Sequence, residues 1–285
     1  MAERTHRLRA CAGELRAVSV LRAFVRWWRA DGLVFSGSLA FLTLLALAPM
    51  LAAAFWLGQQ HEVLKTGERA LRDFLYSNLL PDAARQAGGL LDRLRANARD
   101  LGEVAIAVFL ADILVKTLAI HVAFDRIFRV GGRGVTGHLR GALVLLGVIP
   151  AAVGGLYWLL RFIERLLLRM MPASAAWLGP VFEPIAIGIP LVLALALLYR
   201  YVPQGVHGWR APFAAALVVA VALEAVRWGL SAYVANLAAL RSLYGTAIAV
   251  PVFLASLLAT WALVLLGAAL VAERFAAGRG RPARS

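Results

Sequence analysis

The chain has 285 residues, of which 61% are hydrophobic and only 16% are charged, and its net charge is +14. Soluble domains carry about 25% charged residues, so this composition excludes an ordinary soluble fold. The basic residues are almost all arginines, and they lie mainly at the ends of apolar blocks. This distribution follows the positive-inside rule of membrane proteins and argues against nucleic acid as a partner. The single cysteine, Cys11, excludes an intrachain disulfide.

Residues 1–31 form a basic segment with a helical apolar stripe. The stripe recurs every three or four positions, at Leu15, Val18, Leu21, Val25 and Trp28. Most arginines of the segment lie off this stripe, which predicts an amphipathic helix on the cytoplasmic surface of a membrane. Trp27 and Trp28 are expected at the level of the lipid headgroups, where tryptophan is enriched.

Two stretches lack any charge over a length that can cross a bilayer. Gly32–Gln60 has 29 residues without a charge, and the second stretch covers residues 242–272. About 20 helical residues cross a hydrocarbon core of ~30 Å, so both stretches predict transmembrane helices. The first span is placed at residues 33–57, and Pro49 within it predicts a kink.

Residues 58–100 form the longest polar region, with charges of both signs. Two helical leucine stripes flank Pro81-Asp82, and Pro81 suits the first turn of the second helix. The region therefore predicts a periplasmic hairpin of two helices.

Further apolar blocks complete a single all-α membrane domain, a polytopic bundle of about six transmembrane spans with a cytoplasmic tail at 273–285. The five remaining spans are predicted at residues 101–124, 141–160, 184–201, 211–235 and 245–272.

Lysine and arginine are distributed unevenly between the two sides of this topology. With the N-terminus inside, the cytoplasmic segments carry 17 basic residues and the opposite segments carry 11, seven of them in the charge-balanced hairpin. Cytoplasmic loops of membrane proteins are enriched in basic residues. The N-terminus and the C-terminus are therefore both expected in the cytoplasm.

Four ionisable residues interrupt the predicted second and fifth spans: Asp112, Lys116, Glu224 and Arg227. Asp112 lies ~16 Å from the outer end of its span and Glu224 ~20 Å from the inner end of its own, so both fall near the bilayer centre. Each acid has a base three or four residues later on the same helical face. An unpaired charge at this depth costs about 2.5–3.5 kcal/mol. Both faces are therefore expected to turn inward, forming either a transport site or structural ion pairs.

Four segments in order along the chain carry a family resemblance. Residues 38–49 read SLAFLTLLALAP, residues 123–130 read AFDRIFRV, residues 199–203 read YRYVP before Trp209-Arg210, and residues 244–246 read YGT. Together they resemble the YihY/BrkB family of bacterial inner-membrane proteins. The motif positions picked out by the resemblance are Phe41, Pro49, Asp125, Arg126, Tyr199, Arg200, Pro203, Tyr244 and Gly245.

The resemblance implies six spans, a place in the inner membrane, and a role in transport or in the cell envelope. The family was once labelled ribonuclease BN, a label regarded as mistaken. The chain departs from the family pattern at four positions, where tyrosine, serine, asparagine and tryptophan are usual; these are Leu42, Ala46, Asp125 and Phe128 respectively. An activity that depends on those side chains would differ in this member.

The intramembrane charges and the prolines within spans favour a transporter or translocator of a small or lipidic substrate. The alternative is a non-transporting protein of envelope structure or assembly that acts through partners, and the sequence does not separate the two. The expected partner is a bilayer with anionic headgroups, while protein partners and oligomeric state do not follow from the sequence.

An enzyme is not expected. Metal-dependent nuclease chemistry needs clustered ligands. The five histidines are instead scattered, at His6, His61, His121, His138 and His207. We therefore expect no catalytic residues, no metal and no cofactor, and ribonuclease activity in particular is not expected.

Overall fold

The computed structural model describes residues 20–60, 81–129, 135–170, 178–203, 206, 208–236 and 249–279. Within these ranges every regular element is a helix and no strand occurs, which confirms the predicted all-α class. Parts of the prediction fall outside the described residues: most of the N-terminal segment, the first arm of the hairpin, the motif at Tyr244 and Gly245, and the end of the tail.

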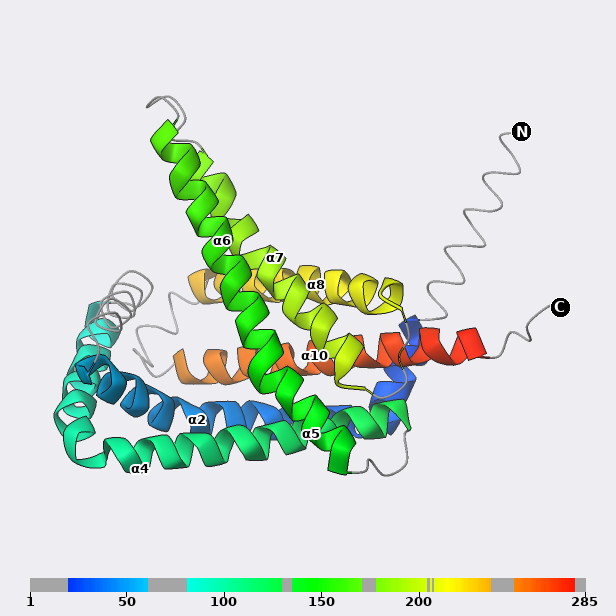
Figure 1. Ribbon diagram of the computed structural model, residues 1–285, viewed down its shortest axis with the longest axis horizontal. Coiled ribbons are helices and arrows are strands. Elements are labelled where there is room, and N and C mark those ends of the chain that lie inside the picture. The colour runs from blue at the N-terminus through cyan, green and yellow to red at the C-terminus, as the bar shows by residue number, and fades with distance from the viewer. Residues whose placement is uncertain are drawn as a thin grey trace. The chain divides into compact units, whose positions relative to one another are not determined.

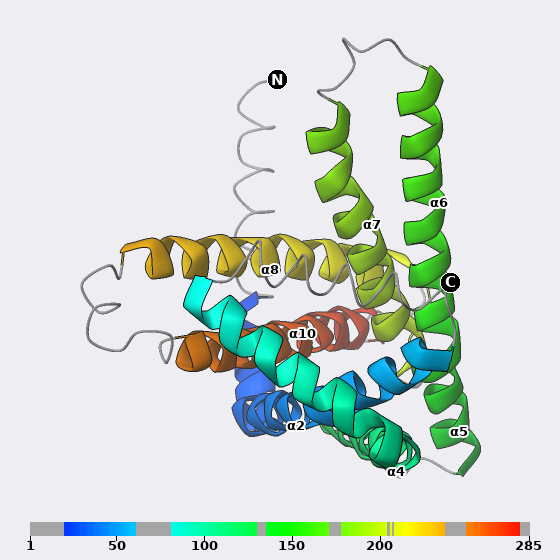
Figure 2. The same ribbon diagram turned by 90° about the vertical axis from the view of Figure 1, so that its left-hand side faces the viewer.

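The helices of Figures 1 and 2 include six segments that are long and apolar enough to cross a membrane, the number predicted from the sequence. These candidate spans are Gly32–Ala53, Glu103–Phe128, Leu139–Leu167, Pro184–Tyr201, Arg210–Tyr233 and Pro251–Ala276. The helices themselves are α2 (Gly32–Gln60), α4 (Pro81–Phe128), α5 (Val135–Leu143), the π-helical η1 (Val144–Val148), α6 (Ile149–Met170), α7 (Leu178–Tyr201), α8 (Arg210–Asn236) and α10 (Ala249–Arg279).

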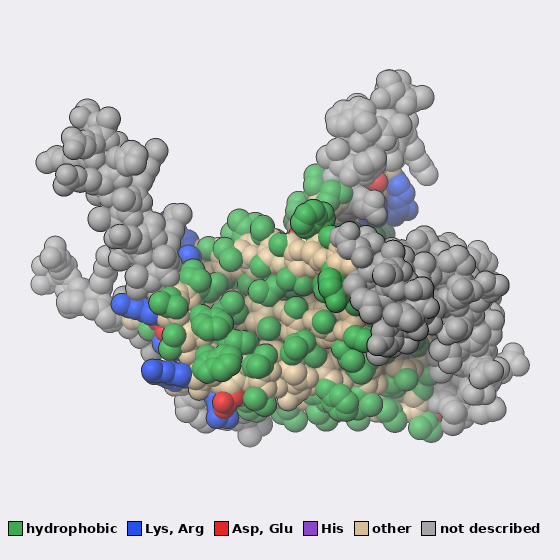
Figure 3. Space-filling model, turned by 180° about the vertical axis from the view of Figure 1, so that it is seen from behind, with side chains coloured by type: hydrophobic (Ala, Val, Ile, Leu, Met, Phe, Trp, Pro, Cys, Tyr) green, Lys and Arg blue, Asp and Glu red, His purple; other side chains and the backbone are tan. Residues whose placement is uncertain are grey.

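The surface of the described helices is largely apolar. Figure 3 shows hydrophobic side chains over the visible helices, and residues as large as Phe41 and Trp228 are more than half exposed. A soluble protein rarely leaves so much contiguous apolar surface in water, whereas lipid chains solvate it. The chain is therefore a multi-pass membrane protein.

The second predicted span is part of a longer helix. α4 begins at Pro81, where the sequence placed the second arm of the hairpin, and continues without interruption to Phe128 over 48 residues. Proline at the first helical position lacks only an N–H that would have no partner there, and no further proline follows within α4. The arm and the span are thus one continuous helix rather than two.

The third span begins earlier than predicted and contains a π-helical turn. α5 starts at Val135, and η1 separates it from α6. The Ile149 N–H donates to the Val144 carbonyl, five residues back, and Pro150 follows without any N–H to offer. Proline cannot maintain an α-helical ladder, so a widened turn before it is a common solution.

The structure divides into two compact units. The first contains residues 1–36, 120–226 and 260–285, and the second contains residues 37–119 and 227–259. In the first unit, α6 and α7 lie side by side and run in opposite directions (Figures 1 and 2). The second unit holds most of α2 and α4.

The core of the first unit forms around Tyr199, which is fully buried. Its hydroxyl donates to the Val264 carbonyl at 2.9 Å, and its ring stacks on that of Phe124, with 6.4 Å between centroids. Gly267 makes this close approach possible, since an added Cβ would lie 2.3 Å from the Tyr199 hydroxyl and 2.6 Å from Val219 Cγ2. One tyrosine therefore joins α7 to α10, with α4 and α8 packed beside it.

Residues 20–29 are helical and belong to the first unit. Leu21, Val25 and Trp28 of the predicted stripe are exposed, whereas Trp27 is buried. Gly32 packs on the Trp27 indole, because a Cβ there would come within 2.3 Å of the ring nitrogen. Trp27 thus packs within the protein, because the turn into α2 provides a packing site for its ring, whereas Trp28 keeps an exposed ring; the depth of both in the membrane stays a prediction.

Candidate functional site

An apolar groove of about 770 Å³ runs between α7 and α8 in the first unit. Among the described residues of its lining, Glu224 is the one ionisable side chain. The volume lies within the range of about 300–1,000 Å³ that is typical of small-molecule sites. The lining residues are Leu156, Pro184, Ile185, Gly188, Ile189, Leu191, Val192, Leu193, Ala196, Trp209, Phe213, Leu217, Ala220, Val221 and Glu224.

Helical periodicity explains why these residues share the groove. From Trp209, the residue before α8, to Glu224 the lining positions recur every three or four residues, which places those of α8 on one helical face. On α7 the positions from Ile185 to Ala196 recur in the same way, and Gly188 contributes no side chain that would fill the space. Trp209 and Glu224 are 15 residues apart, or ~22 Å along the axis of α8. The groove is therefore long and apolar, with an indole and a carboxylate far apart along it.

The structure corrects the expected orientation of the fifth-span charges. Glu224 and Arg227 are both exposed on α8 rather than turned inward. The face that α8 buries carries small and apolar residues instead, including Ala216, Val219 and Leu223. Small side chains allow helices to approach closely, so this face packs into the protein and the carboxylate lies beside the groove.

Asp112 and Lys116 form the ion pair expected from their spacing. Lys116 Nζ lies 3.1 Å from Asp112 Oδ2, with the aspartate buried and the lysine half-buried. The other carboxylate oxygen of Asp112 is also buried and has no hydrogen-bond partner among the described residues. This pair belongs to the second unit, as does Arg227, whereas Glu224 belongs to the first. The structure thus brings Asp112 and Lys116 together on α4.

Two motif positions near the end of α4 and three around the end of α7 lie in the first unit. Arg126 pairs with Asp31 at 2.5 Å, and its guanidinium lies 5.8 Å from the centre of the Phe35 ring. This contact joins the end of α4 to the start of α2. Asp125, next to it, is half-buried.

The remaining motif residues of the first unit shape the α7–α8 connection. Arg200 donates to the Val206 carbonyl and lies 5.3 Å from the centre of the Tyr201 ring, while Pro203 is buried. Tyr199 is the core residue described above. These positions therefore hold the connection that precedes Trp209 and the groove face of α8.

Phe41 and Pro49 lie on α2 in the second unit, where Phe41 is exposed. Neither residue lines the groove. The exposure of Phe41 suits contact with lipid rather than with a ligand site.

One ionic contact escaped the sequence analysis. Arg26 Nε lies 2.5 Å from Glu273 Oε1, and Arg26 also donates to the Ile127 carbonyl at 3.2 Å. Three segments remote in sequence therefore meet at one guanidinium. No local spacing signals such a contact, and the available clue was that Glu273 is the one acidic residue of the sequence from 249 to 285, next to a series of arginines.

Among the described residues, no three histidine, cysteine or carboxylate side chains come together as a metal site. His121 is buried in the first unit, and a Cβ at Gly141 would lie 2.0 Å from its Nε2. This histidine is therefore packed against α5 at a position that only glycine fits.

Comparison with known proteins gives a family and no solved structure. The family model described as Virulence factor BrkB matches residues 23–284. A UPF0761 membrane protein of Stenotrophomonas maltophilia is 30% identical over 87% of the chain and 58% of its own length. A UPF0761 membrane protein of Xanthomonas oryzae is 31% identical over the same shares, and one of Ralstonia nicotianae is 30% identical over 83% and 54%. No solved structure matches the chain.

The chain spans a little over half the length of these curated relatives. The family match nevertheless covers nearly all of this chain, including the described motif positions in α2, α4 and α7. The resemblance seen in the sequence is thereby confirmed. On the six candidate spans and this match, the chain belongs to the BrkB family of membrane proteins.

Proposed function

We propose that this protein translocates a lipidic substrate across the bacterial inner membrane, with both termini in the cytoplasm. The observation that carries the proposal is the groove between α7 and α8, whose described lining carries no charge except that of Glu224. A groove on transmembrane helices has hydrocarbon chains as its natural surroundings, and its lining matches them in polarity. An acyl chain in the groove would meet no desolvated polar group until it reached the carboxylate.

Glu224 adds a functional element to this groove. Ionisable residues inside a membrane are costly and usually mark a substrate or ion pathway. Here the carboxylate is exposed beside an apolar channel, where it can receive a hydrogen-bond donor or a cation from a substrate headgroup. The groove and the acid together suit an amphipathic molecule better than a small polar solute.

The helices around the groove contain prolines and a π-helical turn. α7 contains Pro184 and Pro190, and η1 precedes α6. Interrupted helices and π turns are frequent at transport sites, because their backbone can adapt without unfolding. These features support a groove whose width changes during a transport cycle.

A pair of matched tryptophan variants tests the proposal. Val221 lines the groove and is exposed, and Val218 is a similarly exposed valine on α8 that does not line it. In liposomes carrying fluorescent phospholipids, the protein should accelerate exchange between leaflets, as followed by quenching of the outer leaflet. Val221→Trp should reduce this rate at least about tenfold, by narrowing the groove, while Val218→Trp should leave it unchanged.

Glu224→Gln is the second arm of the test. It should insert normally and also slow exchange, whereas Glu103→Gln, at an exposed acid on α4, should behave as the parent protein. If liposomes with and without the protein exchange every tested phospholipid at the same rate, translocation is refuted. If Val221→Trp and Val218→Trp slow exchange equally, the groove is not the path.

A protein of envelope structure or assembly is the second candidate, favoured by one observation. The Asp112–Lys116 pair balances its two charges within α4, as a structural element would, although the second Asp112 oxygen has no partner among the described residues. A stable co-purifying partner together with no lipid exchange would favour this role. We propose no catalytic role for either candidate, so purified protein free of contaminants should not cleave RNA.

The proposed orientation rests on the excess of arginine in the segments assigned to the cytoplasm. It is tested by single cysteines in a Cys11→Ser background. Ala84→Cys in the hairpin arm should react with impermeant thiol reagents from the periplasmic side, and Ala277→Cys near the end of α10 should react only after the membrane is opened. Labelling of both positions from the same side would overturn the six-span arrangement.

A further inference from the structure

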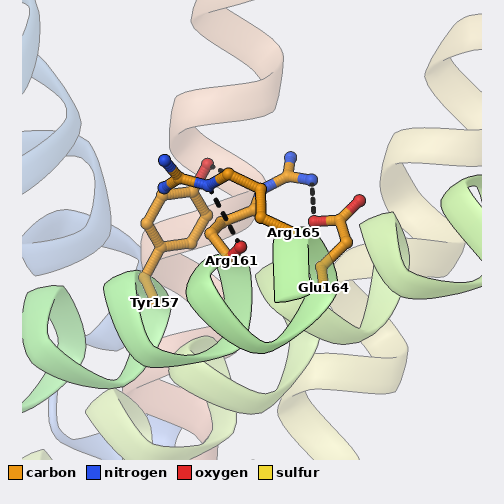
Figure 4. A network of polar contacts seen from close by, with 4 residues as sticks. All are labelled: Tyr157, Arg161, Glu164 and Arg165. Carbon is orange, nitrogen blue, oxygen red and sulfur yellow. Dashed lines mark hydrogen bonds and ion pairs between the residues drawn. The ribbon is translucent and has the colours of Figure 1, made fainter. Parts of the chain in front are cut away.

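A second cavity, of about 400 Å³, lies on α6 in the first unit. Figure 4 shows four of its lining residues on one side of the helix. Their spacing of four, three and one residues brings them together on a single helical face. The lining comprises Tyr157, Trp158, Arg161, Glu164 and Arg165.

Arg161 is held in one geometry by its neighbours. Its Nη1 donates to Glu164 Oε2 at 2.7 Å, and its Nε donates to the Tyr157 hydroxyl at 3.3 Å. The guanidinium also lies 5.6 Å from the centre of the Tyr157 ring. A planar guanidinium fixed in this way loses little conformational freedom when it binds a ligand.

Arg165 supplies the charge that Glu164 does not balance. Its Nε donates to the Arg161 carbonyl at 3.2 Å, which leaves the two terminal nitrogens available among the described residues. The cluster has two guanidinium groups and one carboxylate, so it carries one net positive charge. An anion with several oxygens would complete it, and phosphate matches the fork of an arginine through paired hydrogen bonds.

The place of the cluster along the span points to a lipid. Arg161 and Arg165 lie six and two residues before Leu167, the end of the third candidate span, or ~9 and ~3 Å from it. Trp158 stacks on Phe162 at 5.5 Å, and both side chains are exposed beside the arginines. Aromatic rings and long basic side chains together are typical of the headgroup level of a membrane.

We propose that this α6 pocket binds the phosphate of an anionic phospholipid, with the acyl chains lying along the apolar surface of α6. The occupant is a lipid rather than a free anion because exposed aromatic residues adjoin the arginines on the same helix. Leu156, one residue before the cluster, lines the α7–α8 groove. The inference that the bound lipid is also the transported one rests on the proposed function, whereas the binding itself does not.

Lipid retention by the purified protein tests the binding. Intact protein in detergent is exchanged with phosphatidylglycerol or phosphatidylcholine, and native mass spectrometry counts the lipids that stay bound. The parent protein should retain phosphatidylglycerol in preference. Arg165→Gln should weaken that affinity about tenfold or more, because a charge-assisted hydrogen bond is lost. The affinity of Arg165→Lys should lie between those of the parent protein and Arg165→Gln, since lysine keeps the positive charge and lacks the paired donors of the guanidinium.

The matched control is Arg140→Gln, which removes an exposed arginine of α5 outside the pocket. It should retain phosphatidylglycerol as the parent protein does. If Arg165→Gln and Arg140→Gln lose phosphatidylglycerol to the same extent, the site is refuted. It is also refuted if the parent protein retains phosphatidylglycerol and phosphatidylcholine equally. Displacement of the lipid by inorganic phosphate alone would identify a free-anion site and refute the lipid. If Arg165→Gln does not fold, Arg165→Met, which keeps an unbranched side chain and removes the guanidinium, should show the same loss of phosphatidylglycerol retention.

Binding and translocation give separate readouts. Lost selectivity with unchanged lipid exchange would refute the link between the pocket and transport and leave the groove as the path. Intact phosphatidylglycerol binding with no lipid exchange would refute the proposed function and support the headgroup site by itself.

Discussion

The helices α4 and α6 each hold an ion pair between an acid and a base within one turn, and the two pairs differ in what surrounds them. On α4, one lysine meets one buried aspartate, so the charges balance and little surface is left for a ligand. On α6, Glu164 meets Arg161 while Arg165 stays open to the surroundings, so one positive charge is left over. Sequence spacing alone makes the two arrangements look alike. The number of charged partners that each residue has, and the exposure of its side chain, distinguish the closed structural pair on α4 from the open binding cluster on α6.

The largest effect is expected from breaking the closed pair. Lys116→Ala would leave Asp112 buried without its cation, and removing one partner of a buried pair costs about 3 kcal/mol or more. Unfolding by denaturant in mixed micelles should show this loss. The double variant Asp112→Leu/Lys116→Leu is the control, because it removes both charges and should remain within about 1 kcal/mol of the parent protein. A single variant as stable as the parent would show that the pair is not closed.

A smaller loss of stability is expected at a site where close packing, rather than an ion pair, holds the helices together. Gly267→Ala would place a methyl group 2.3 Å from the Tyr199 hydroxyl and force the core of the first unit apart. Overpacking of this kind costs about 1–3 kcal/mol. Gly229→Ala, at a position on α8 with nothing within 4 Å, should keep or slightly raise stability under the same denaturant titration. Equal stabilities for the two variants would contradict the tight contact.

The smallest effect on stability is expected at the open cluster. Arg165 is exposed and its hydrogen bond runs to its own helix, so Arg165→Gln should change the free energy of unfolding by less than about 0.5 kcal/mol. The same micelle titration measures it beside Lys116→Ala. A loss as large as that of Lys116→Ala would place Arg165 with the closed pair and remove the contrast between the two helices.

The sequence predicted features that depend on local chemistry. Two uncharged stretches and four further apolar blocks, each long enough to cross a bilayer, identified the six spans, and Pro81 marked the start of a helix. The spacing of Asp112 and Lys116 predicted their contact, because residues four apart on a helix face each other. Pro150 was equally visible, and its consequence for the third span was missed because the π turn depends on how the preceding backbone adjusts.

Only the tertiary structure decided which helical faces are buried, and this is where the sequence analysis failed. The free-energy cost of placing a charge in lipid predicted that Glu224 would turn toward the protein interior. The face of α8 with small residues packs into the protein instead, so the Glu224 carboxylate lies beside the groove. The same holds for Arg26, whose partners Glu273 and Ile127 are remote in sequence. Span number and helical register follow from each segment's own hydropathy and periodicity. Ion pairing and burial depend on which helical faces pack against the same neighbouring helices. That information is not contained in the sequence of any one segment.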